Sequence, residues 1–316
     1  MFRKLVVLLA KISGYFHWDI LWQIGRSLSR SDRLLLALRL LQDEVEHYTI
    51  CRDNLTWTAF GWDIQMCWPL LQHGLFQGDQ IQAVTSWIIA NDRVKSHRNI
   101  IVDVGANIGT TSIPFAKNLN CHVLAIEPFP KNFMLLNHNV IQNGFNRQIT
   151  CVQSAIATKN GTMKMTLPKK ESGSASIYQK TAKSLQNHPK VDVPAAKLMD
   201  ILTSARISPE QVAFVWSDTE GSEARIVETG APLWQTGVPL YIEVFPRLLE
   251  RQSGISSLKK LVVKYFREFI PVESLMKNGA AADRVSISQF SKLLDYLEQK
   301  PDLTDVLLLP KGFDAQ

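Results

Sequence analysis

One short run of the sequence combines glycines with a carboxylate at a spacing that could hold a charged ligand. The run D-V-G-A-N-I-G-T, from Asp103 to Thr110, follows an apolar stretch and precedes a helical one. Such a strand-to-helix junction offers backbone N–H groups and a helix N-terminus to a ligand. A dinucleotide-binding loop would need glycines where Asn107 and Thr110 stand. Because Asp103 would also repel a diphosphate, the run favours a ligand that carries a positive charge.

A second carboxylate, Glu127, follows the next apolar run, 18 residues beyond Gly109. A carboxylate at the end of a strand can accept hydrogen bonds from both hydroxyls of a ribose. Asp103, the glycine loop and Glu127 together predict a site for an adenosine ligand that carries a cation. A tight turn alone would explain Gly105 and Gly109, but not carboxylates at the ends of two strands.

Acidic side chains follow two further predicted strands. Asp218 and Glu220 lie in the run S-D-T-E-G-S-E (217–223) and share side-chain parity, so both can face one ligand if the chain stays extended. Two carboxylates this close do not ionise independently, and one can keep a raised pKa suited to accepting a proton. We expect Asp218 to be the base and Glu220 its neighbour, with Glu243 and then His188 as further candidates. The other interpretation is a charge cluster at the start of the following helix.

These side chains are positioned by short apolar runs that alternate with helical stretches from Asn99 onward, which is typical of an α/β fold. Residues 96–316 predict one domain, a mostly parallel twisted sheet with helices on both faces. We expect five parallel strands, which in chain order are Ile100–Val104, Val123–Ile126, Ile149–Ile156, Val212–Trp216 and Pro239–Phe245. A hairpin at 161–167 is expected after the third of them, and Asp305–Leu309 is expected as a last antiparallel strand at the sheet edge.

Residues 1–95 predict a helical N-terminal extension. Leu, Ile, Trp and Phe recur at spacings of three and four between Phe2 and Leu41, as on a helix with one apolar face. We expect these helices to cover the main domain. The alternative is a peripheral membrane contact through residues 1–25, where apolar and basic side chains lie together. No stretch reaches the roughly 20 apolar residues that cross a bilayer, and no signal-peptide cleavage site follows the N-terminal apolar run.

The composition argues against several functions. Lys+Arg 35 and Asp+Glu 29 give a formal net charge of +6, but the basic residues are scattered, which disfavours nucleic-acid binding. The 4 cysteines and 7 histidines show no metal-ligand spacing, so we expect no metal. Free thiols and the lack of an export signal predict a cytoplasmic protein, with peripheral membrane contact as the variant.

The same motifs resemble those of the FkbM-type methyltransferases, which use S-adenosylmethionine within the class I Rossmann-like fold. The resemblance covers roughly residues 75–247 and rests on I-V-D-V-G-A-N-I-G-T-T (101–111), I-E-P-F-P-K-N (126–132), H-N-V-I-Q-N-G (138–144), Ser154-Ala155 with Asn160-Gly161, and S-D-T-E-G-S-E (217–223). Two places depart from the family pattern. Trp216 stands where a Lys is usual, two residues before Asp218, and the segment before the fourth strand reads L-M-D (198–200) where L-D is common.

By this resemblance the cofactor is S-adenosylmethionine, and the residues that would bind it lie at the ends of three strands. The residues that would border the methionine part are Asp103, Gly105, Asn107 and Gly109, and Ala106 of the same loop is a further cofactor-binding candidate. Glu127 would bind the ribose, and Ser154 and Ala155 would flank the adenine.

The resemblance also implies O-methylation, with the methyl group passing to a hydroxyl of a sugar or of another polyhydroxylated small molecule or glycan. The stretch 159–190, rich in Lys and Ser, would close over this acceptor. Two alternatives stay open. One is an NAD-dependent oxidoreductase on a Rossmann fold, which Asn107 and Thr110 disfavour. The other is a non-catalytic adenosine-binding scaffold protein, which remains in view because Trp216 replaces the family's Lys.

Overall fold

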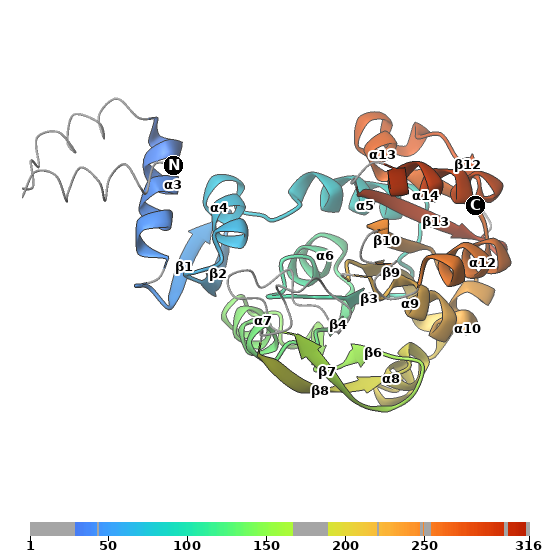
Figure 1. Ribbon diagram of the computed structural model, residues 1–316, viewed down its shortest axis with the longest axis horizontal. Helices are drawn as coiled ribbons and strands as arrows, with labels where there is room; N and C mark the ends of the chain where they lie inside the picture. Colours follow the sequence, from blue (N-terminus) through green and yellow to red (C-terminus); the bar gives the residue numbers. More distant parts are fainter. Residues whose placement is uncertain are drawn as a thin grey trace, which may run out of the picture. The chain divides into compact units, whose positions relative to one another are not determined.

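The computed structural model describes residues 29–42, 44–166, 189–219, 221–246, 249, 254–299 and 303–313 (Figure 1). The chain divides into two compact units, Met1–Gly74 and Leu75–Gln316. The division precedes α5 (Gly78–Ala90) and does not fall near residue 95, where the sequence suggested it. The reason is that α5 packs within the second unit, against α6 (Ser112–Leu119) and α13 (Val272–Asn278).

The described part of the first unit, residues 29–42 and 44–74, contains a β-hairpin between two helices, which the helical interpretation of the sequence did not include. Its elements in chain order are α3 (Arg30–Leu41), β1 (His47–Arg52), β2 (Leu55–Phe60) and α4 (Ile64–His73). Asp53 and Asn54 have positive φ angles of 52° and 60° and form the two-residue turn between the antiparallel strands. This Asp-Asn pair between two β-branched and aromatic runs is the signal that the helical interpretation missed.

Several predictions concern residues outside the described ranges. They are the membrane contact of residues 1–25, Glu220, His188 and most of the stretch 159–190. Among the helices that are described, none is long and apolar enough to cross a membrane.

The second unit is built on an eight-stranded sheet in the order β12-β11-β13-β10-β9-β3-β4-β5. The strands from β10 to β5 run parallel, which confirms the predicted α/β sheet. Their bounds are β3 (Ile100–Val104), β4 (His122–Ile126), β5 (Ile149–Val152), β9 (Val212–Ser217) and β10 (Leu240–Val244). Figure 1 shows β9 beside β3 and β10 next to β9, although a long stretch of chain separates β3 from these two strands.

The last strand, β13 (Thr304–Pro310), is antiparallel as predicted but does not form the sheet edge. It lies between β10 and β11 (Phe266–Pro271), and the two-residue β12 (Val285–Ser286) lies outside β11. The edge prediction was wrong because β11 went unrecognised. It follows α12 (Ile255–Tyr265) directly, with no Gly or Pro to mark the boundary.

The predicted strand Ile149–Ile156 is split between two sheets. Its first part is β5, whereas its second part joins a three-stranded sheet of order β6-β8-β7. The bounds there are β6 (Ala155–Ile156), β7 (Gly161–Thr166) and β8 (Lys190–Ala196). The hairpin expected at 161–167 was wrong, because β7 pairs with β8, which lies beyond residues 167–188.

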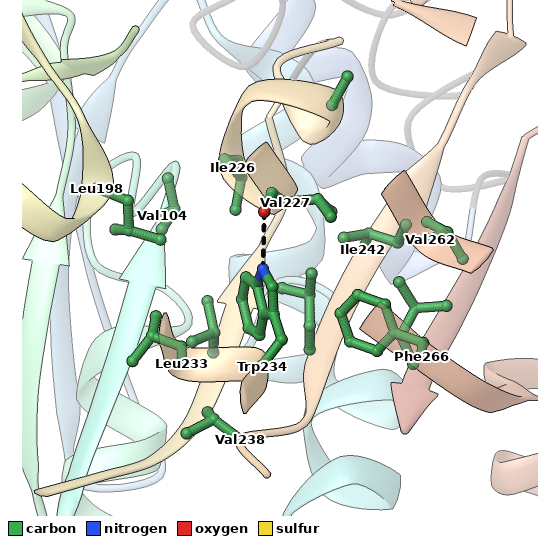
Figure 2. Packing of buried hydrophobic residues seen from close by; sticks show 14 of the residues in the cluster. Val104, Leu198, Ile226, Val227, Leu233, Trp234, Val238, Ile242, Val262 and Phe266 are labelled. Atoms are coloured by element: carbon green, nitrogen blue, oxygen red, sulfur yellow. Dashed lines mark hydrogen bonds between the residues drawn. The ribbon is translucent and has the colours of Figure 1, made fainter. Parts of the chain in front are cut away.

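Helices cover both faces of the main sheet. On one face, apolar residues of the strands form a core with five helices, namely α8 (Leu198–Ser204), α9 (Glu223–Thr229), α10 (Ala231–Gln235), α12 and α14 (Phe290–Gln299). Within this core Trp234 packs beside Ile242 and Phe266, and its indole N–H donates to the carbonyl of Val227 at 2.8 Å (Figure 2). The buried indole therefore has its hydrogen-bond partner.

The other face of the sheet packs aromatic rings against α5 and α6. The ring centroids of Trp87 and Phe214 are 6.5 Å apart, and those of Phe115 and Trp216 are 5.6 Å apart. Asp103 of β3 is in register with Trp216 of β9, so it belongs to this face. The aromatic face therefore ends in the acidic side chains of the candidate site.

Candidate active site

A loop with three left-handed residues follows β3. Gly105, Asn107 and Gly109 have φ angles of 89°, 50° and 94°, a region that glycine adopts freely and asparagine tolerates better than most residues. Asn107 can therefore adopt the positive φ angle that this turn needs, although glycine would adopt it more easily. A β-carbon at position 105 would lie 2.1 Å from the backbone oxygen of Asp218, so only glycine fits there.

Glu127, which follows β4, holds this loop in place. Its Oε2 accepts the N–H of Asn107 at 2.9 Å, and its Oε1 accepts the N–H of Phe129 at 2.8 Å. Burial raises the pKa of Glu127 to about 8, and the two N–H bonds oppose that rise. Because each carboxylate oxygen can accept a further hydrogen bond, Glu127 can bind ribose hydroxyls while it holds the loop.

Asp103, at the end of β3, has one carboxylate oxygen without a partner. Its Oδ2 accepts the hydroxyl of Ser112 at 2.5 Å, while its Oδ1 has no hydrogen-bond partner among the described residues. Burial raises the pKa of Asp103 to about 7, although the Ser112 bond lowers it. A buried oxygen without a donor is costly, so the site would be stabilised by a ligand that brings a cationic N–H group.

Asp218 follows β9 and lies beside the glycine loop. Its N–H donates to the carbonyl of Val104 at 3.1 Å, and its Oδ2 accepts the side-chain amide of Gln77 at 2.9 Å. A further side-chain hydrogen bond joins Asp218 to Glu243. Burial raises the pKa of Asp218, and both side-chain hydrogen bonds lower it. Two carboxyl groups this close do not ionise independently, and we call them the Asp218–Glu243 pair.

The acidic group extends from β10 to β13. Glu243 stands opposite Asp305 in the antiparallel register. Burial raises the pKa of Asp305 to about 6, and the charge of Asp218 contributes to the rise. Burial and then the nearby carboxylates raise the pKa of Tyr241. Three carboxyl groups and one phenol therefore lie close together beside the glycine loop.

Trp216 fills the position at which the family resemblance implies a Lys. Its side chain is fully buried and stacks on Tyr241, with ring centroids 3.6 Å apart and planes at 7°. It is in register with Asp103 on β3 and with Tyr241 on β10. An aromatic ring thus occupies the expected place of a cation, which leaves Asp103 without a basic neighbour at that position.

Glu223, the first residue of α9, organises the loop after Asp218. Its Oε1 accepts the hydroxyl of Thr219 and the N–H of Gly221, both at 3.1 Å. Burial raises the pKa of Glu223 to about 8. The interpretation as a helix-start group thus describes Glu223, whereas Asp218 lies against the glycine loop. Glu220 lies outside the described residues.

The residues predicted to flank the adenine follow β5, next to Glu127. The N–H of Glu127 donates to the carbonyl of Val152 at 3.1 Å, which joins the ends of β4 and β5. Ser154 is buried, and its hydroxyl donates to the carbonyl of Ala155 at 3.0 Å. Ala106 is buried within the glycine loop. The described candidates therefore gather at the carboxyl ends of the parallel strands.

Three residues that lie among these candidates were not identified from the sequence, namely Gln77, Ser112 and Asp305. Gln77 and Asp305 come from segments far from the motifs, and only the fold brings them to Asp218. Ser112 had a local signal, since it is a hydroxyl residue at a helix start, close after the Asp103 motif. No group of three His, Cys, Asp or Glu residues in the described part of the chain is arranged to hold a metal ion.

The sequence model of the methyltransferase FkbM domain matches residues 103–300, which is more than half of the 316 residues. The chain belongs to the FkbM methyltransferase family. This FkbM methyltransferase therefore transfers methyl groups from S-adenosylmethionine. The loop fits such a cofactor in one respect: Asp103 Oδ1 is a buried oxygen without a donor in the described residues, and the ammonium group of the methionine part could supply one.

Comparisons with solved structures found distant likenesses. A transferase from Pyrococcus horikoshii is 11% identical, with 84% of this chain and 72% of that chain covered and a TM-score of 0.41. An O-methyltransferase from Bacillus cereus in complex with S-adenosylhomocysteine is 12% identical, with 73% and 80% covered and a TM-score of 0.40. At these scores the likenesses carry no argument, and the assignment depends on the family match. A comparison with curated proteins found no match.

Proposed function

We propose that this FkbM methyltransferase transfers the methyl group to a hydroxyl oxygen of a sugar or of another polyhydroxylated small molecule or glycan. The observation that carries the proposal is the Asp218–Glu243 pair beside the glycine loop. A hydroxyl group must lose its proton as it gains a methyl group, and a carboxylate within hydrogen-bond reach can take that proton.

Four groups of residues would bind the cofactor. Asp103, through its unpartnered Oδ1, would bind the ammonium group of the methionine part, because opposite charges attract most strongly where water is excluded. The glycine loop would approach the rest of that part closely. Glu127 would accept the ribose hydroxyls, and Ser154 with Ala155 would border the adenine.

Asp218 would act as the base, with Glu243 as its neighbouring acid. When bound, S-adenosylmethionine supplies a methyl group on a positively charged sulfur. The acceptor oxygen forms its bond to the methyl carbon as the carbon–sulfur bond breaks, the electron pair of that bond stays on sulfur, and the hydroxyl proton goes to Asp218. Positioning of the two reactants supplies most of the rate, and the base adds roughly 10²- to 10⁴-fold.

The acceptor side of the site favours hydroxyl groups. Glu243, Asp305 and Tyr241 offer both donors and acceptors of hydrogen bonds near the proposed base. Sugars present several hydroxyls that such a set can bind. The stretch 159–190 is proposed to cover the acceptor, and Glu220 is proposed as a neighbour of Asp218.

The test is turnover with methyl-labelled S-adenosylmethionine against sugars, nucleotide-sugars and lipid extracts. The proposal expects label in a hydroxylated acceptor, with the new methyl group on oxygen by mass spectrometry and NMR. A methyl group on nitrogen or carbon would contradict it. So would labelled cofactor that binds but transfers to none of the hydroxylated acceptors.

A further inference from the structure

Gln77 reaches the proposed base from a distant part of the sequence. Its Nε2 donates to Oδ2 of Asp218 at 2.9 Å, although 141 positions separate the two residues. It is the residue before α5, and its side chain makes no capping hydrogen bond to that helix. The side chain of Gln77 is therefore not needed to start the helix, and its described contact is with Asp218.

The backbone of Gln77 adopts a conformation that glutamine disfavours. Its φ and ψ angles are 52° and 34°, in the left-handed region. Residues other than Gly and Asn occupy this region at a cost, and such strain gathers at functional sites. The strained backbone directs the amide group to the carboxylate, since the hydrogen bond is made from this conformation.

The amide makes the two carboxyl groups of the Asp218–Glu243 pair unequal. The NH₂ group of Gln77 can only donate, so its bond to Oδ2 favours the ionised form of Asp218. The other titratable groups whose charges act on Asp218 or feel it are all acids or a phenol; in the described residues they are Asp103, Glu223, Tyr241, Glu243 and Asp305.

We propose that Gln77 is a positioning residue that holds Asp218 ionised and oriented to accept the proton of the acceptor hydroxyl. The inference rests on the proposed function, since it assumes that Asp218 faces the methyl group. It adds a residue outside the motifs that define the family resemblance. It also accounts for a strained backbone at the start of α5.

The test uses two cofactor analogues and needs no acceptor. Sinefungin carries an amine where S-adenosylmethionine carries its methyl–sulfonium centre, whereas S-adenosylhomocysteine lacks a positive charge there. The ratio of their affinities therefore reports the ionisation of the group that faces the methyl position, and the effects of Asp103 and Glu127 cancel. In the wild type, this ratio should rise with pH as Asp218 ionises.

The decisive variant is Gln77→Met, which keeps the length of the side chain and removes the donor. Loss of one hydrogen bond to a charged group should move the midpoint of that rise upward by about one pH unit. Gln82→Met, on an exposed position of the same helix, is the matched control and should leave the midpoint in place. An unchanged midpoint in Gln77→Met would overturn the inference.

A second variant separates positioning from folding. Gln77→Gly relieves the left-handed strain, so its melting temperature should equal or exceed that of the wild type while the midpoint still moves upward. A lower melting temperature with an unmoved midpoint would show that Gln77 is only structural. If the wild type binds neither analogue, the proposed function itself fails, and this result is distinct from a failure of the Gln77 inference.

Discussion

Gly105 and Asp218 approach so closely that the backbone oxygen of Asp218 lies 2.1 Å from where a β-carbon at position 105 would be. The N–H of Asp218 also donates to the carbonyl of Val104, the residue before this glycine. The proposed cofactor loop and the proposed base are thus fitted against each other. A change at position 105 should therefore affect both cofactor binding and the placement of the base.

The first prediction concerns Gly105→Ala. The added methyl group has to displace the backbone at Asp218, so we expect S-adenosylhomocysteine to bind at least tenfold more weakly by calorimetry. Gly144→Ala is the matched control, because Gly144 has a similar φ of 79° but open space around its β-carbon position. That control should lose roughly 1 kcal/mol of stability and keep its affinity. Equal affinities in both variants would contradict the prediction.

The second prediction concerns Asp218→Asn. The variant keeps the shape of the side chain and removes the base, so turnover on the acceptor found in the labelled-cofactor panel should fall by about two orders of magnitude or more. Affinity for S-adenosylhomocysteine should change only a few-fold. The control is Asp192→Asn, which removes a surface partner of Lys164. If the turnover of Asp218→Asn stays within a few-fold of the wild type, Asp218 is not the base, and Glu243 becomes the next candidate.

The third prediction is that cofactor binding releases protons at pH 7. Burial raises the pKa of Glu127 to about 8, so the free protein carries a proton there that ribose binding should expel. Calorimetry of S-adenosylhomocysteine binding in buffers of different ionisation enthalpy measures the number of protons released. The release should be smaller in Glu127→Gln, in which position 127 no longer ionises. Equal proton release in the two proteins would argue against a ribose-binding carboxylate at position 127.

The fourth prediction concerns stability and pH. Burial raises the pKa of Asp103 to about 7 and the pKa values of Glu127 and Glu223 to about 8 in the folded protein. The folded state therefore binds more protons than the unfolded state, so protonation of these three carboxyl groups stabilises the fold. That contribution is complete below the unfolded pKa values and is lost as pH rises toward 8. Urea unfolding of the ligand-free protein should give a free energy that falls between pH 5 and 8. Glu127→Gln should flatten this dependence, and a free energy that rises over the same range would refute the account.

Much of the fold could be predicted from local patterns because parallel strands leave continuous apolar runs. The runs that became β3, β4, β9 and β10 are buried on both faces, which is why their composition is so distinct. In contrast, β11 could not be located from the sequence, since it continues directly from α12. The hairpin of the first unit was missed because the helical spacing between Phe2 and Leu41 was extended over residues 47–60, where Asp53-Asn54 marks a turn.

The candidate site was predictable where its residues lie in one motif. Asp103, Gly105 and Glu127 stand at strand ends that the apolar runs mark, and the structure brings them together. Gln77 and Asp305 carry no such mark, because their place beside Asp218 depends on α5 and β13, which lie far from the motif in sequence. The packing of Trp216 could not be predicted either, because it depends on stacking against Tyr241 of the neighbouring strand.

The most direct test of the central claim is a calorimetric titration of the full chain with S-adenosylhomocysteine and, separately, with NAD. The account predicts that S-adenosylhomocysteine binds and raises the melting temperature, that Gly105→Ala weakens this binding, and that NAD does not bind. Binding of NAD without binding of S-adenosylhomocysteine would contradict it.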